Sequence, residues 1–472
     1  MPKNILIFSD GTGQSGGQTP DESRSNVYKL FRAARCGPEN NIDPSAQFAF
    51  YDPGLGSPAD GGGYRFNSAR RLYNFLSGAT GLGITRNIID CYGAIVRVWE
   101  PGDRIYLFGF SRGAYTVRCV GGVLGLCGVP TRMKDGSALK RDQPSANAIA
   151  EEAVKRVYQF GSSIKGDPKK PQRLARAAAF RTAYACDMDG ASNAVPYFIG
   201  VWDTVAALGM GLAALSITAL ALFAACAAIV RFGALGLLDW PQSAVVVLAG
   251  AAIGYVILSI RYGQPMSVAR YRMAFYNTKL NPAVAFARHA ISIDENRLDF
   301  RQAAWDEDGS EKVARHVGGP ERFKQVYFAG VHSDIGGGYG EPEARLSDIA
   351  LQWMLEEVKA LPAPIIVDDR YLHLSPLAAG PQHDERRSFV AGWPNWFVRL
   401  AGLFVARERL GWSEGFREAP HDALLHPSVI ERFKAPAVLI YGDVLPYRPF
   451  CLRGHDLVKQ YYQDASAQKP GS

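Results

Sequence analysis

The sequence predicts an α/β fold in which helices cover both faces of a mostly parallel sheet, with a long apolar insertion in its middle. Short apolar runs alternate with stretches that carry apolar residues at helical spacing, and glycine-rich turns join them. Such alternation is typical of right-handed strand–helix–strand crossovers, which form parallel sheets between helices. Two long uncharged segments after residue 205 predict the insertion.

The individual elements follow from the apolar periodicity. Strands are expected where a short run is almost entirely apolar, and helices where apolar residues recur every three or four positions. The expected strands are residues 5–9, 104–110, 196–202 and 325–331. The expected helices are residues 26–34, 85–98, 114–126 and 346–360, and a run at residues 283–288 also looks helical.

Composition and charge exclude several classes of protein. The chain has 472 residues, a formal net charge of +7 and 7 cysteines. Its mean hydropathy of −0.07 is typical of neither a polytopic transporter nor a disordered chain. The cysteines are scattered, so we expect no disulfide scaffold, no metal and no cofactor. Basic runs are short, so no nucleic acid partner is expected. The apolar run at residues 5–8 is too short for a signal peptide.

The two uncharged segments are residues 209–230 and 244–260. Because about 20 apolar residues cross a hydrocarbon layer of about 30 Å, we interpret residues 208–262 as an inserted transmembrane helical hairpin. A pair of buried core helices is the alternative interpretation. Basic residues crowd the chain after the second segment rather than the loop between the two. This bias predicts that the rest of the chain lies on the cytoplasmic side of the membrane.

The insertion divides the chain into three expected parts. Residues 1–207 and 263–350 would form one catalytic domain, and residues 208–262 would form the hairpin. The looser pattern of residues 351–472 predicts a C-terminal extension of helices and loops that packs on the catalytic domain.

A candidate nucleophile lies in the sequence Gly-Phe-Ser-Arg-Gly at residues 109–113, which matches G-x-S-x-G. The motif follows an expected strand and opens an expected helix, as the nucleophile elbow of an α/β-hydrolase-like fold requires. Gly109 and Gly113 would permit the sharp turn, and Ser111 would lie at the N-terminus of the helix. The helix dipole and the backbone N–H of Arg112 would then stabilise an oxyanion.

A second oxyanion donor is expected from the loop after the first strand. Asp10, Gly11 and Thr12 form a glycine-containing turn directly after residues 5–9. A backbone N–H of this loop would point toward the same edge of the sheet as Ser111. A simple tight turn is the alternative, and the sequence lacks the pattern of a phosphate-binding P-loop.

A serine nucleophile needs a base and an orienting acid. Asp203 and His332 each follow an expected strand, and their order after Ser111 matches the serine–acid–histidine order of α/β hydrolases. His289 is the rival base and Asp334 the rival acid. Structural roles, a hydrogen-bonded core histidine and a helix-capping aspartate, are the alternatives.

Taken together, these residues resemble the α/β-hydrolase catalytic domain of type VI secretion phospholipase effectors of the Tle type. The matching stretches run in order over roughly residues 3–350; they are residues 8–12, 109–115 with 117–118, 200–205, 288–290 with 294–295, and 330–339. The resemblance implies hydrolysis of glycerophospholipid esters, with Ser111 as nucleophile and Asp203 and His332 as its partners. The hairpin five residues after Asp203 departs from the simple family pattern.

The predicted function is therefore that of a membrane-associated serine lipase or esterase, phospholipase-like, that works through an acyl-enzyme. One alternative is a lipid hydrolase with a dyad of Ser111 and Asp334, and another is a non-catalytic membrane protein that retains the hydrolase fold. The expected partners are an ester lipid and the bilayer, with an immunity or secretion protein as a further candidate. The expected location is the bacterial inner membrane, with delivery to the periplasm of a target cell as the alternative.

Overall fold

A computed structural model gives the fold of most of the chain. It describes residues 2–11, 24–37, 39–54, 84–161, 167–205, 280–297, 300, 302–305, 320–385 and 415–462. The predicted hairpin, residues 208–262, lies outside the described residues. Within the described ranges, no helix combines the length and the apolar composition that crossing a bilayer requires.

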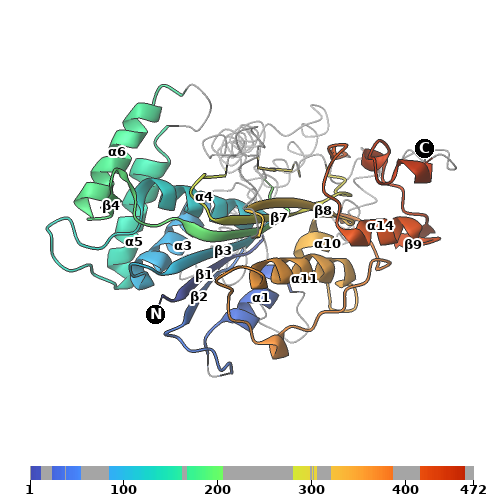
Figure 1. Ribbon diagram of the computed structural model, residues 1–472, viewed down its shortest axis with the longest axis horizontal. Coiled ribbons are helices and arrows are strands. Elements are labelled where there is room, and N and C mark those ends of the chain that lie inside the picture. Colours follow the sequence, from blue (N-terminus) through green and yellow to red (C-terminus); the bar gives the residue numbers. More distant parts are fainter. Residues whose placement is uncertain are drawn as a thin grey trace, which may run out of the picture.

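Six parallel strands form the central sheet, in the order β2-β1-β3-β6-β7-β8 (Figure 1). They are β1 (Asn4–Ser9), β2 (Gln47–Asp52), β3 (Arg104–Phe110), β6 (Pro196–Trp202), β7 (Phe286–Ser292) and β8 (Phe323–Phe328). Because all six run in one direction, their carboxyl ends meet at the same edge of the sheet. Parallel sheets of this kind place their functional residues at that edge.

Helices cover both faces of the sheet (Figure 1). One face carries α3 (Ile84–Val98), α4 (Arg112–Cys127), α5 (Gln143–Glu151), a π-helix (Glu152–Tyr158) and α6 (Lys170–Ala183). The other face carries α1 (Asn26–Ala34), α10 (His332–Gly336) and α11 (Arg345–Lys359). The predicted α/β fold with helices on both faces is confirmed.

Strand β1 shows why both faces are covered. Successive side chains of a strand point to opposite faces of the sheet. All six residues of β1 are buried because helices cover both of these faces. Ile5 and Ile7 pack into the apolar cluster under α3 and α4, whereas Leu6 and Phe8 pack into the cluster under α1 and α11. A continuous apolar run is therefore what a central parallel strand needs.

The C-terminal residues cover the far edge of the sheet, beyond β8 (Figure 1). They include α14 (Pro427–Lys434), the strand pair β9 (Val438–Ile440) and β10 (Asp443–Leu445), and two short 3₁₀ helices, Phe450–Leu452 and Lys459–Tyr462. Tyr327 of β8 exchanges backbone hydrogen bonds with this segment, donating to the Leu424 carbonyl and accepting from the His426 N–H. Phe433 is 1% exposed in a third apolar cluster that also contains Tyr327.

One predicted helix is wrong. Residues 283–288 were expected to be helical, but Phe286–Ser292 forms β7, which pairs with β6 and β8. A short apolar run does not distinguish a buried strand from a buried helix, and here the two neighbouring strands decide. The predicted strand at residues 325–331 is also shifted, because β8 ends at Phe328 and Gly330 turns the chain at φ +118°.

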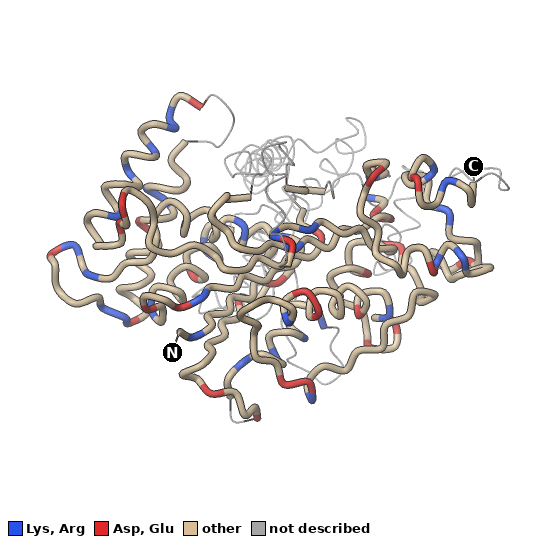
Figure 2. Tube along the Cα trace, viewed as in Figure 1, with Lys and Arg blue, Asp and Glu red and all other residues tan. Residues whose placement is uncertain are grey.

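Charged side chains of both signs are interspersed along the described chain (Figure 2).

Two further strands, β4 (Asp187–Met188) and β5 (Ala191–Ser192), form a small hairpin after α6. A 3₁₀ turn at Asp369–Tyr371 follows α11.

Candidate active site

Ser111 occupies the sharp turn between β3 and α4. Its backbone has φ 57° and ψ −120°, a conformation that residues other than glycine rarely adopt. The Ser111 N–H donates to the carbonyl of Trp202 at the end of β6, 3.1 Å away, which ties the turn to the neighbouring strand. The side chain thus projects from the carboxyl edge of the sheet.

The two glycines of the motif are required by close backbone contacts. A Cβ on Gly113 would lie 2.0 Å from the carbonyl oxygen of Ser9 in β1. A Cβ on Gly109 would lie 2.6 Å from the carbonyl oxygen of Gly113. The predicted reason for these glycines, a close approach of strand and helix, therefore agrees with the geometry.

The structure brings Ser111, His332 and Asp203 into one chain of hydrogen bonds. The Ser111 Oγ lies 2.8 Å from Nε2 of His332, and Nδ1 of His332 lies 2.5 Å from Oδ2 of Asp203. All three side chains are buried. When Nδ1 carries the proton donated to the carboxylate, Nε2 is free to accept the serine hydroxyl proton.

Backbone contacts hold the acid and the histidine in these positions. Asp203 directly follows β6 with φ 37°, and its N–H donates to the Ala290 carbonyl of β7, 2.8 Å away. The N–H of Ser292, at the end of β7, donates to Oδ1 of Asp203 at 2.9 Å. His332 is the first residue of α10, and its N–H donates to Oε2 of the buried Glu295 at 3.0 Å.

Two aromatic rings enclose the imidazole of His332. The ring centroid of Phe110 lies 4.6 Å from that of His332, and the ring of Phe300 meets it edge-on at 5.3 Å. These apolar walls exclude water from the hydrogen bonds of the site and so strengthen its electrostatic interactions.

Arg417 is the charged partner of Asp203. Burial alone would raise the pKa of the Asp203 carboxyl, but Arg417 and His332 outweigh it and hold that pKa well below its usual range. Asp203 therefore carries its negative charge at any physiological pH.

The loop after β1 lies in a polar cluster centred on Asp10. The carboxylate of Asp10 accepts hydrogen bonds from the hydroxyls of Ser25 and Tyr51 and from the N–H of Gly11. Burial raises the pKa of Asp10 to about 6. The Gly11 N–H thus already has an acceptor, Thr12 lies outside the described residues, and an oxyanion role for this loop stays a prediction.

The rival base and the rival acid lie in other contacts. His289 is fully buried on β7, where Nε2 accepts from the Thr204 N–H and Nδ1 faces the side-chain carbonyl of Gln325. Burial, together with the charge of Arg118, lowers the pKa of His289 to about 3, so its ring is neutral. Asp334 accepts from Nδ1 of His383 at 2.7 Å. Burial raises the pKa of Asp334.

Three residues of the site were not assigned a role from the sequence. Glu295 lies within a stretch that carries the family resemblance, but its contact with the His332 backbone has no sequence signal. Phe300 and Arg417 do not follow any of the strands predicted from the sequence, so the rule that identified Asp203 and His332 does not find them. Arg417 is 214 positions from Asp203, and no spacing rule connects them.

Within the described chain, no three His, Cys, Asp or Glu side chains are grouped so that they could hold a metal ion.

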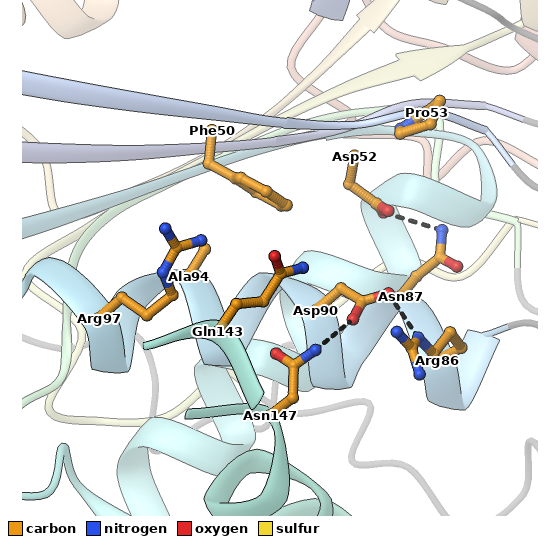
Figure 3. Close-up of a pocket in the computed structure, with 10 residues that line it drawn as sticks. All are labelled: Phe50, Asp52, Pro53, Arg86, Asn87, Asp90, Ala94, Arg97, Gln143 and Asn147. Atoms are coloured by element: carbon orange, nitrogen blue, oxygen red, sulfur yellow. Dashed lines mark hydrogen bonds and ion pairs between the residues drawn. The ribbon is translucent and has the colours of Figure 1, made fainter. Parts of the chain in front are cut away.

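A polar cavity of about 240 Å³ lies beside the edge strand β2, between β2, α3 and α5 (Figure 3). Its polar side chains largely bond to one another: Asn87 donates to Asp52, and Arg86 and Asn147 bond to Asp90. None of Ser111, His332 and Asp203 lines it.

A buried serine at a strand-to-helix turn, bonded to a histidine that is bonded to a carboxylate, is the arrangement typical of serine hydrolases with an α/β fold. The chain belongs to the family of type VI secretion system phospholipase effectors described as Tle1-like, whose catalytic domain matches residues 3–357.

The individual relatives have low sequence identity to this chain. An uncharacterized protein of Saccharomyces cerevisiae is 27% identical over 211 residues, which cover 44% of this chain and 27% of the yeast protein. A crystal structure of an uncharacterized protein from Pseudomonas aeruginosa is 17% identical with a TM-score of 0.35, covering 79% of this chain and 48% of that one. A structure of the Tle1 effector bound to the VgrG spike of the type VI secretion system is 15% identical with a TM-score of 0.30, covering 73% and 53%. The chain thus spans about a quarter of the yeast relative and about half of each solved chain.

Proposed function

We propose that the protein hydrolyses acyl esters of membrane phospholipids, with Ser111 as nucleophile, His332 as general base and Asp203 as orienting acid. The observation that carries this proposal is the continuous hydrogen-bonded chain of these three buried side chains. Membership in a family of phospholipase effectors supports the lipid ester as substrate.

In the proposed mechanism, the Ser111 Oγ attacks the ester carbonyl carbon while His332 Nε2 accepts its proton. The carbonyl oxygen becomes an oxyanion beside the N-terminus of α4, where the Arg112 N–H is the first proposed donor. Collapse of this intermediate expels the alcohol, which takes the proton from His332 and leaves an acyl-serine. A water molecule, deprotonated by His332, then attacks the acyl carbonyl, releases the fatty acid and returns the proton to Ser111.

The proposal extends to association with a bilayer through residues 208–262. These residues begin five positions after Asp203 in sequence, so a membrane hairpin there would hold the site against the lipid that carries its substrate. Family membership supports delivery to a target cell as the place of action. The inner membrane of the producing cell is the other proposed location.

The first test labels the detergent-solubilised protein with a fluorophosphonate probe. We expect the wild type and Ser45→Ala, which changes an exposed loop serine, to be labelled, and Ser111→Ala to remain unlabelled. If the folded wild type stays unlabelled in both detergent and liposomes, the proposal is wrong and the non-catalytic alternative gains support.

A second test separates the triad from the dyad of Ser111 and Asp334. His332→Ala should lower kcat by several orders of magnitude, because it removes the base that contacts Ser111. Triad members are typically worth about 10⁴-fold or more. Asp334→Asn should keep most of the turnover, because Asp334 bonds to His383. The reverse ranking of the two variants would favour the dyad.

A third test concerns the bilayer. Replacing residues 208–262 by a short Gly-Ser linker should abolish membrane fractionation and lower activity on phospholipid vesicles far more than activity on a short soluble ester. Equal losses on both substrates would contradict a membrane role for this segment.

A further inference from the structure

Arg417 makes a two-pronged contact with the carboxylate of Asp203. Its Nη1 lies 2.5 Å from Oδ1 and its Nη2 lies 3.0 Å from Oδ2. Arg417 is 9% exposed and Asp203 is fully buried. A bidentate pair of this kind fixes the plane of the carboxylate as well as its charge, and it is stronger than an exposed ion pair.

The guanidinium itself is held from its remaining sides. Nε and Nη2 donate to the carbonyl of Phe300 at 3.2 and 2.8 Å, and Nη1 also reaches the carbonyl of Ser292 at 3.3 Å. Two residues earlier, the Gly415 N–H donates to the Asn296 carbonyl at 2.9 Å, which pins the segment that carries Arg417. The arginine is therefore a fixed part of the site.

These contacts give each carboxylate oxygen of Asp203 two partners. Oδ1 accepts from the Ser292 N–H and from Arg417, whereas Oδ2 accepts from His332 and from Arg417. Arg417 thus also contacts the oxygen that orients the imidazole, Oδ2, through its Nη2. Phe300, whose carbonyl holds the guanidinium, also packs its ring against His332.

We propose that Arg417 is a positioning residue of the active site, which fixes the Asp203 carboxylate for its bond to His332 and offsets part of its negative charge. This inference rests on the proposed function, because it assigns Arg417 a part in the same hydrolysis. Arg417 touches Asp203 rather than the reacting atoms, so it acts through the acid. It also lies outside the family match at residues 3–357, so the C-terminal segment completes the site.

The charge effect has a definite sign. In a triad the carboxylate stabilises the imidazolium that forms during attack. Removing the guanidinium would leave the Asp203 charge uncompensated and favour protonated imidazole, which is inactive as a base. The acid limb of the pH dependence of kcat/KM would therefore move to higher pH. The other titratable or charged groups around the pair are His332, His289, Tyr327, Glu295 with its partner Arg297, and Arg118 beside His289.

The test compares Arg417→Met and Arg417→Lys with the wild type in the full chain, solubilised in detergent, on a short soluble ester. We expect Arg417→Met to lower kcat by roughly 10- to 100-fold with little change in KM, short of the about 10⁴-fold loss expected for a missing triad carboxylate. Its acid limb should move up by about 1 pH unit. Arg417→Lys keeps the charge but loses the fork, so it should restore the acid limb more fully than kcat.

A matched control and a double variant make the test specific. Arg432→Met removes a second arginine of the C-terminal segment, which is fully buried and bonds to the carbonyls of Ala378 and Gly380. It should lower the unfolding temperature and leave the pH profile in place. In an Asp203→Asn background, which has no carboxylate charge, Arg417→Met should lower kcat much less than it does in the wild type.

The outcomes separate the two proposals. If the wild type is labelled by the fluorophosphonate and Arg417→Met and Arg417→Lys both keep the wild-type pH profile, Arg417 is a structural ion pair and this inference is wrong. If Arg417→Met fails to fold, Arg417→Lys decides alone: an unchanged kcat with an unchanged profile overturns the inference. A wild type without labelling contradicts the proposed function instead.

Discussion

At the residue scale, Asp10 is a carboxyl group under opposing influences. It is 2% exposed, which disfavours its ionised form, while three donors from Ser25, Tyr51 and Gly11 favour it. Burial prevails and raises the pKa of Asp10 from its ordinary value of 3.8 to about 6. Between about pH 4 and 6, Asp10 is therefore mostly protonated in the folded chain and mostly ionised in the unfolded chain.

This raised pKa predicts how stability depends on pH. Between about pH 4 and 6, unfolding releases the Asp10 proton, so the contribution of Asp10 to the free energy of unfolding falls as pH rises through this window. Asp10→Asn removes this contribution and should change the difference in stability between pH 4 and pH 7 by up to about 3 kcal/mol. Urea unfolding at pH 4, 5, 6 and 7 measures it. Asp189→Asn, at an exposed turn, should keep the wild-type slope, and a wild-type slope in Asp10→Asn would contradict the prediction.

Residues of the candidate site differ in how far the sequence reveals them. Ser111 directly follows β3 and Asp203 directly follows β6, while His332 comes four residues after β8 ends. Each is therefore found by a local rule, because the ends of parallel strands gather at one edge. Arg417 follows no strand of the sheet and reaches Asp203 only through the packing of a distant segment. Periodicity and motifs carry no information about such a contact.

At the scale of elements, the strongly patterned ones were predictable and the weakly patterned ones were not. The helix predicted at residues 26–34 is α1, and its N-cap Ser25 accepts from the Tyr28 N–H. The edge strand β2 was not predicted, because four of its six residues are only half buried and its sequence contrast is weak. Local periodicity does not identify β7 as a strand, since its pairing with two neighbouring strands lies outside any local window.

The elbow between β3 and α4 gives an element-scale prediction, because two effects compete at Gly113. Helix propensity alone would favour Gly113→Ala by about 0.5–1 kcal/mol. A Cβ there, however, would lie 2.0 Å from the Ser9 carbonyl oxygen, which belongs to the backbone of β1. Relieving the clash requires α4 to move away from β1, and overpacking of this kind costs about 1–3 kcal/mol or more.

We therefore expect Gly113→Ala to lower the urea midpoint and to slow fluorophosphonate labelling of Ser111 strongly. Labelling rate and unfolding midpoint are measured on the same preparation. Gly37→Ala is the matched control, because a Cβ at Gly37 meets nothing within 4 Å. If Gly113→Ala is labelled and unfolds as Gly37→Ala does, the close approach at the elbow is not a requirement of the site.

At the scale of the whole molecule, the site depends on a segment far along the chain. The described residues 415–462 pack on β7 and β8 through a third apolar cluster, and the same segment delivers Arg417 to Asp203. Besides the contacts of Arg417 and Gly415, Tyr327 of β8 exchanges two backbone hydrogen bonds with this segment, and Phe433 packs in the shared cluster. Weakening one of these contacts lowers the free energy at which the segment opens locally, relative to global unfolding.

Phe433→Ala should therefore separate loss of activity from loss of fold. Truncating a buried phenylalanine typically costs about 3–5 kcal/mol, and here the cost falls on the apolar cluster that the C-terminal segment shares with Tyr327 of β8 and Ile291 of β7. As urea rises, we expect ester hydrolysis to decline at a lower concentration than the helical circular dichroism signal, because Arg417 leaves Asp203 before the sheet unfolds. Phe180→Ala on α6 removes another buried phenylalanine, from the apolar cluster under α3 and α4, and its activity and helical signal should decline together. Coincident transitions in Phe433→Ala would mean that the C-terminal segment and the sheet unfold as one unit.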